Sequence, residues 1–120
     1  VMAMELHILP SNNADYENMW FCRLSYAEYI FDEILDYIKI PKMNMLYEHL
    51  SAHQNKSLCL VLYLDEYPRE DVIELKRAAG EALEYLRTDG PGDYKGMEDA
   101  LSKITGYTEE LITRLDGWGY

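Results

Sequence analysis

The 120-residue sequence predicts a single α+β domain in which helices cover a small sheet of about three strands. Three short apolar runs bounded by turn residues predict the strands, over residues 4–9, 18–24 and 58–64. Apolar residues at helical spacing between and after these runs predict the helices. The length suits one domain, and 48% hydrophobic residues can form a core. We expect an α+β body over residues 1–88 and a C-terminal helical hairpin over residues 94–120.

The first two runs predict a β-hairpin followed directly by a helix. Pro10 ends the first run, and the turn-forming residues 11–15 separate it from the second. Ser25 and Glu28 have the spacing of a capping box, which predicts a helix from about Tyr26 to Lys39. In an alternative, the helix begins near Asp15 and replaces the second strand.

The middle of the chain predicts two further helices on either side of the third strand. Residues 44–53 form the shorter one, and Pro68 stands near the start of a longer helix that ends at about Arg87. The run 58–64 is continuously apolar or aromatic, which is typical of a strand buried on both faces. Gly80, inside the long helix, lowers helix propensity, so we expect close packing of a neighbour against it.

The C-terminal segment 101–115 resembles a helix-turn-helix motif, with Gly106 at the turn between helices over 97–104 and 108–115. In DNA-binding examples the start of the second helix enters the major groove. Here that position holds Thr108, Glu109 and Glu110, and two carboxylates would face phosphates. The sequence therefore favours a hairpin used for packing, and a transcription regulator that uses residues 101–115 remains the alternative function.

Motifs for catalysis, metals and cofactors are incomplete. His49 and His53 share one helix face but lack the third ligand of a zinc site. The glycines of residues 90–96 follow a helix and lack the Gly-Lys-Ser/Thr ending of a phosphate loop. No Gly-x-Ser-x-Gly elbow is present. We therefore expect no catalytic residues, no metal and no cofactor, and an enzyme with a carboxylate in a cleft is a third possibility.

Cysteines and hydropathy point to a cytoplasmic protein without a membrane anchor. Cys22 and Cys59 lie in apolar runs, which favours buried free thiols over a disulfide. No apolar stretch reaches the roughly 18 residues that a membrane span needs. No basic segment followed by an apolar one indicates a secretory signal.

The acidity of the chain points to a basic partner. Its net charge of −11 argues against direct nucleic-acid binding, which needs surplus Lys and Arg. Eleven tyrosines, several beside acids, are far more than a small core requires. A tyrosine ring can accept a cation on its face while a neighbouring carboxylate accepts hydrogen bonds from arginine. Acids at i, i+4 and i+8 form one ridge, and the predicted partner-binding residues are Glu28, Tyr29, Asp32, Asp36, Tyr37, Glu66, Tyr67, Glu70 and Glu74.

We therefore expect a small non-enzymatic protein that binds and inhibits a basic protein partner by occupying its cationic cleft. A nuclease or another nucleic-acid-binding enzyme fits that description, because such enzymes bind phosphates through cations. Immunity proteins, antitoxins and anti-CRISPR-like anti-defence proteins share this profile of size, acidity and tyrosine content. Electrostatic steering into the cleft would be followed by burial of tyrosine side chains.

Overall fold

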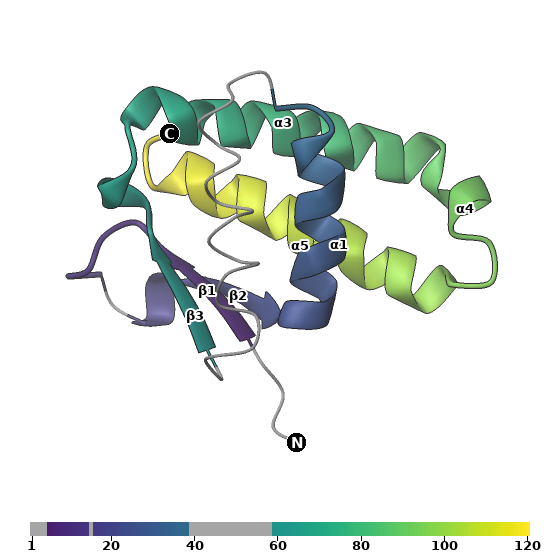
Figure 1. The fold of residues 1–120 in the computed structure, drawn as a ribbon, viewed down its shortest axis with the longest axis horizontal. Coiled ribbons are helices and arrows are strands. Elements are labelled where there is room, and N and C mark those ends of the chain that lie inside the picture. The colour runs from purple at the N-terminus through teal and green to yellow at the C-terminus, as the bar shows by residue number, and fades with distance from the viewer. Residues whose placement is uncertain (1–4, 15, 39–58) are drawn as a thin grey trace.

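The computed structural model describes residues 5–14, 16–38 and 59–120, and it confirms the predicted α+β class (Figure 1). The strands are β1 (Glu5–Leu9), β2 (Trp20–Arg23) and β3 (Cys59–Tyr63), in the order β2-β1-β3. β1 pairs antiparallel with β2 and parallel with β3. The predicted hairpin is thus confirmed. The alternative helix from Asp15 is wrong, because only one 3-10 turn, η1 (Tyr16–Asn18), precedes β2.

One face of the sheet supplies core residues. The buried side chains alternate along the strands, as the period of two requires, and they include Leu6, Ile8, Trp20, Cys22 and Leu62. On the other face Phe21 is 50% exposed. β3 lies at the edge of the described sheet, and its Val61 and Tyr63 are half-buried. The prediction of a strand buried on both faces is therefore wrong for these two residues.

Helix α1 (Leu24–Leu35) follows β2 without a loop. Its apolar stripe is buried as the helical spacing predicts, through Ala27, Ile30, Phe31 and Ile34. The predicted capping box is wrong, because the helix begins earlier than expected. Arg23 occupies the N-cap without a side-chain bond, and Ser25 lies exposed inside the first turn.

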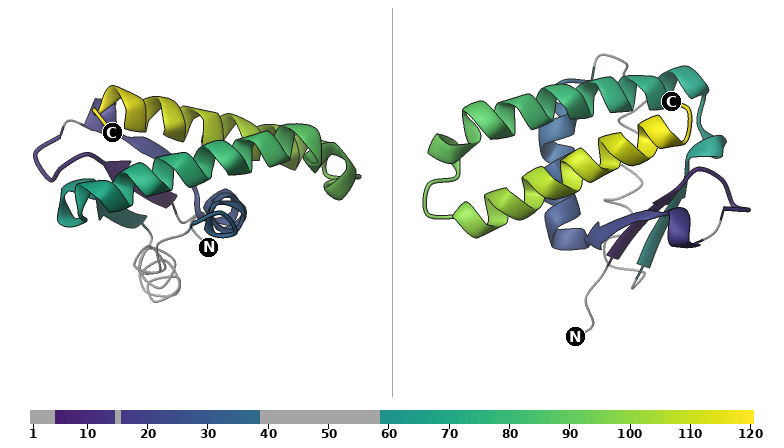
Figure 2. Two further views of the ribbon diagram at one scale, coloured as in Figure 1. Left: turned by 90° about the horizontal axis from the view of Figure 1, so that it is seen from above. Right: turned by 180° about the vertical axis from the view of Figure 1, so that it is seen from behind.

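The C-terminal half forms a pair of long helices. A 3-10 turn, η3 (Leu64–Glu66), leads to α3 (Arg69–Thr88), which agrees with the predicted helix from Pro68. The short α4 (Gly90–Asp93) connects it to α5 (Glu98–Gly117). The views in Figure 2 show α3 and α5 side by side, joined at one end through α4, with α1 crossing them.

No break divides α5 at Gly106, so residues 101–115 form part of one helix and not a helix-turn-helix. The buried stripe Ile104, Thr108, Leu111 and Leu115 continues through this region at helical spacing. The Thr108 hydroxyl donates to the carbonyl of Ile104 at 2.8 Å, one turn earlier in the same helix, so Thr108 does not stand at the start of a second helix. The C-terminal hairpin predicted over residues 94–120 is therefore replaced by the single helix α5.

Gly80 is exposed, and a Cβ added there would meet no atom within 4 Å. The expected close packing against Gly80 is therefore wrong. A different glycine has a close neighbour. A Cβ on Gly90 would lie 3.0 Å from Cδ1 of Leu101.

Several predictions fall outside the described residues. These are the helix over 44–53 and the histidine pair His49 and His53. The predicted end of the first helix at about Lys39 is wrong, because α1 ends at Leu35 with Asp36 as its C-cap. Cys22 is a buried free cysteine, and burial raises the pKa of its thiol to about 12. Among the helices that the structure describes, none is both long and apolar enough to cross a membrane.

Candidate protein-binding surface

The outer side of α1 carries the first predicted group of partner-binding residues. Glu28, Tyr29, Asp32 and Asp36 are all exposed, and Tyr29 exposes 45% of its surface. Glu28, Asp32 and Asp36 lie about one helical turn apart, because each turn takes 3.6 residues, and Tyr29 lies one turn before Asp32. The buried stripe of α1 fixes this orientation: Ile30, Phe31 and Ile34 point into the core, so the acids point outward.

Crowding of acids on α1 affects their ionisation. Burial raises the pKa of Asp32 first, and the nearby Asp36 raises it further. Burial also raises the pKa of Glu33, as do the charges of Asp36, Asp32 and Asp93, against a lowering by a hydrogen bond from Tyr94. The ionised form of these carboxyl groups is thus disfavoured in the native state. A cation placed beside them would stabilise the ionised form.

Residues from α3 and α4 extend this surface. Tyr94 is buried to 8% exposure, and its hydroxyl donates to Oε1 of Glu33 at 3.0 Å. The hydroxyl of Tyr85 donates to Asp93. The rings of Tyr29 and Tyr94 meet edge to face, with centroids 6.4 Å apart. We call this set the acid–tyrosine cluster, and define it as Tyr29, Glu33, Tyr37, Tyr85, Asp93 and Tyr94.

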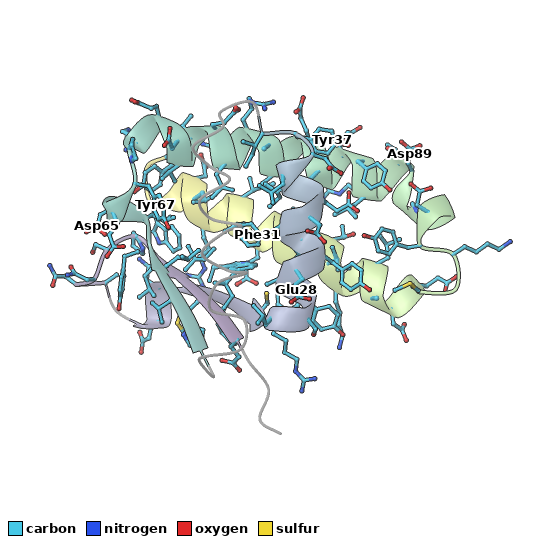
Figure 3. The ribbon with its side chains drawn as sticks, viewed as in Figure 1. Glu28, Phe31, Tyr37, Asp65, Tyr67 and Asp89 are labelled. Carbon is cyan, nitrogen blue, oxygen red and sulfur yellow. The ribbon has the colours of Figure 1, made fainter. Side chains whose placement is uncertain are left out.

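Tyr37 ties the end of α1 to α3. Its backbone carbonyl accepts a hydrogen bond from Nη2 of Arg77 at 2.6 Å. In Figure 3, Tyr37 lies near the end of α3 that carries Asp89. The charges of Glu33, Asp36, Glu81 and Asp89 all act on the Tyr37 hydroxyl and, together with desolvation as the largest cause, raise its pKa. Acids from two helices therefore converge around this ring.

The second predicted group, near the start of α3, lies apart from the first. Figure 3 shows Asp65 and Tyr67 beside the end of β3, away from Glu28 on α1 and from Tyr37 just after it. Glu66 and Glu70 are exposed, and Tyr67 is half-buried, where burial and then Glu66 raise its pKa. The predicted residues thus form two separate surfaces and not one.

Glu74 is paired within its own helix. It is 9% exposed, and its carboxylate accepts hydrogen bonds from Arg77. Arg77 also donates to Glu81 at 2.7 Å. Glu74 therefore lacks the exposure of the other predicted acids, and its role in partner binding stays a prediction. Its place one turn before Arg77 on the same helix makes an internal ion pair.

The charge of the acid–tyrosine cluster is poorly compensated within the molecule. Among the described residues, no lysine or arginine forms an ion pair with its acids Glu33 and Asp93, nor with the neighbouring Asp32 and Asp36. Arg77, which reaches Tyr37, is engaged by Glu74 and Glu81. The cluster can therefore act chemically as an acceptor of cations and of N–H donors.

Arg114, a cation of the segment 101–115 that resembles a helix-turn-helix, lines a groove elsewhere. Its guanidinium lies 3.4 Å from Oδ1 of Asn18 and 3.8 Å from Oε1 of Glu110. Thr113 and Trp118 complete the lining with Gly117. Two acids follow Thr108 on the same helix, so this end of α5 does not present a basic surface to DNA.

Metal ligation finds no support in the part of the chain that the structure describes. No group of three or more His, Cys, Asp or Glu side chains is arranged there to hold an ion. Comparison of the chain with protein-family models, with curated proteins and with solved structures finds no match. The chemistry of the surface itself is therefore the basis for any proposal about function.

Proposed function

We propose that this chain is a small, non-enzymatic inhibitor that binds a basic protein through the acid–tyrosine cluster and the acids beside it on α1. The observation that carries the proposal is the convergence of acids and tyrosines from α1, α3 and α4 without a compensating cation among the described residues. Burying such a surface against cations would pair its charges. An acidic net charge of −11 would also steer the chain toward a positive partner.

The partner class follows from competition for cations. An enzyme that binds nucleic acid gathers lysine and arginine in its cleft to contact phosphates. Carboxylates on α1 would occupy the same cations and exclude the substrate. A nuclease or another nucleic-acid-processing enzyme in the cytoplasm is thus the proposed target. An immunity protein, an antitoxin and an anti-CRISPR-like protein are the biological settings in which such an inhibitor acts.

Electrostatic steering speeds association with the partner, and we expect contacts of tyrosine side chains to supply further binding affinity. Tyrosine is enriched among residues whose truncation weakens protein interfaces, since its ring buries a large area and its hydroxyl finds a partner. Tyr29 exposes 45% of its surface and is held by its edge-to-face contact with Tyr94, so less side-chain entropy would be lost there on binding. We therefore expect charge to govern the rate of association and the tyrosines to govern dissociation.

The test is capture of the partner from the source organism, with the wild-type chain and an Asp32→Asn, Asp36→Asn variant immobilised in parallel. We expect a basic protein to be enriched on the wild type over the variant. Its activity on nucleic acid should fall when wild-type chain is added, and added nucleic acid should compete with the inhibition. A partner that is acidic, or one whose activity is unaffected, would overturn the proposal.

A matched variant controls for general loss of charge. Glu66→Gln, Glu70→Gln also removes two carboxylates, but from the separate surface at the start of α3. This variant should capture the partner as well as the wild type does. Equal losses in both variants would show that net charge alone, and not the surface around α1, holds the partner.

A further inference from the structure

Among the tyrosines whose side chains the structure describes, Tyr29 is the one that is exposed. It exposes 45% of its surface in the middle of α1, although helical tyrosines can turn toward a core. Its ring therefore presents an aromatic surface to solvent beside the exposed acids of α1.

The contact with Tyr94 holds this ring in place and leaves it open. The two rings meet at an interplanar angle of 65° with centroids 6.4 Å apart, which is an edge-to-face contact. In such a contact a ring uses either its edge or one of its faces. At least one face of Tyr29 therefore lies outside the contact. The Tyr94 hydroxyl donates a hydrogen bond to Glu33, so the buried ring that contacts Tyr29 is itself held in place.

Carboxylates stand beside the open ring. Asp32 and Glu33 follow Tyr29 by three and four residues on α1, the spacings that place helical side chains next to one another. Asp32 is exposed, and Glu33 already accepts the Tyr94 hydroxyl. A cation over the Tyr29 ring would thus have a carboxylate within reach.

Other tyrosines of this chain already carry cations on their rings. Arg69 lies over Tyr120, with its guanidinium carbon 5.2 Å from the ring centroid. Lys103 lies over Tyr26 at 5.6 Å. Within the described residues no such cation lies over Tyr29, although its ring is more exposed than theirs. An arginine or lysine of a basic partner could make the same kind of contact with Tyr29.

We infer that Tyr29 is a receptor for an arginine side chain of the basic partner. The guanidinium would stack on the open face of the Tyr29 ring and donate hydrogen bonds to Asp32. Arginine suits this arrangement better than lysine, because its planar fork can stack and donate at the same time. This inference rests on the proposed function and names the partner chemistry at its centre.

The test compares two labelled probes of equal charge, a hexa-arginine and a hexalysine peptide, by fluorescence anisotropy. We expect the wild-type chain to bind hexa-arginine about two- to fivefold more tightly than hexalysine, the effect of a cation–π contact at an exposed site. In Tyr29→Ala this preference should disappear while hexalysine affinity stays the same. Tyr29→Phe, which keeps the ring, should retain the preference.

Controls separate this inference from the proposed function. Phe21→Ala removes another exposed ring, on β2, and should leave the preference intact. Asp32→Asn, Asp36→Asn should weaken both peptides. Equal affinity of the two peptides for the wild type, or a preference that survives in Tyr29→Ala, would overturn the arginine receptor alone. Failure of the wild type to bind either peptide would contradict the proposed function itself.

Discussion

The hydroxyl of Tyr94 donates a hydrogen bond to Oε1 of Glu33 at 3.0 Å, across 61 residues of sequence. This bond joins the C-cap of α4 to the last turn of α1. It also brings the edge-to-face partner of Tyr29 into position. The geometry of the proposed binding surface therefore depends on a contact between two elements that are far apart in the chain.

Removing this bond should destabilise the fold measurably. In Tyr94→Phe the ring stays and the hydroxyl is lost, so we expect the free energy of unfolding to fall by about 0.5–1.5 kcal/mol. Urea denaturation measures the loss. Tyr85→Phe is the matched control, because its bond to Asp93 is exposed and joins neighbouring elements. An equal loss in both variants would contradict the special place of the Tyr94 bond.

Stability should rise as the pH falls from neutral toward about 4, the ordinary range for carboxyl groups. The pKa values of Asp32 and Glu33 are raised in the native state, above all by burial. A carboxyl whose native pKa lies above its unfolded value binds more protons when folded, so acid favours the folded chain in that window. Urea denaturation over this pH range measures the effect.

The variant Asp32→Asn, Glu33→Gln should flatten this rise, and the new amide side chain keeps an oxygen that accepts the Tyr94 hydroxyl. Glu98→Gln is a control of opposite sign. Backbone N–H groups lower the pKa of Glu98, so its contribution to stability is lost as the pH falls through its native pKa. Removing it should make the rise steeper. The same pH profile in the wild type and in the Asp32→Asn, Glu33→Gln variant would contradict the assignment.

Glycine substitutions should distinguish open from packed positions. Gly80→Ala adds a Cβ where nothing lies within 4 Å on an exposed helical face. We expect a gain of about 0.5–1 kcal/mol in the free energy of unfolding. The Cβ of Gly90→Ala would lie 3.0 Å from Leu101, so its gain should be smaller or negative. Thermal denaturation compares the two, and a larger gain at Gly90 would contradict the packing.

Gly106→Ala tests whether α5 is continuous. An alanine there meets no atom within 4 Å and removes the entropic cost of a glycine inside a helix. We expect the free energy of unfolding to rise by about 0.5–1 kcal/mol, and the helical signal in circular dichroism should not fall. At a helix-turn-helix turn, the same substitution would destabilise the protein. A loss of stability would therefore restore the motif that the structure replaces with one helix.

The periodicity of apolar residues predicted most of the strands and helices of the fold. These patterns are local. Buried residues alternate along β1 and β2 within one hairpin, and α1 buries Ala27, Ile30 and Ile34 within about two turns. The predicted turn at Gly106 was wrong, because it rested on one glycine and not on the apolar spacing around it. Ile104, Thr108, Leu111 and Leu115 keep one helical stripe across that glycine, and this signal was present in the sequence.

The candidate site was only half predictable, for reasons of distance along the chain. Tyr29, Asp32 and Asp36 share one helix, so their spacing alone placed them on one face. The contributions of Asp93 and Tyr94 depend on how α4 packs against α1, which no local pattern encodes. The ion pair of Glu74 was predictable, because Arg77 stands three residues later, a spacing at which opposite charges pair within a helix.

The most direct test of the central claim is the association rate of the captured partner with two charge-reversed variants, measured by surface plasmon resonance at low and high salt. Asp32→Lys, Asp36→Lys changes the surface of α1, and Glu66→Lys, Glu70→Lys makes the same change in net charge at the start of α3. We expect the α1 variant to associate about tenfold more slowly or worse at low salt, with a much smaller effect of the α3 variant. The difference should shrink at high salt. Equal rates for the two variants, or a rate for the wild type that does not depend on salt, would contradict binding through the surface around α1.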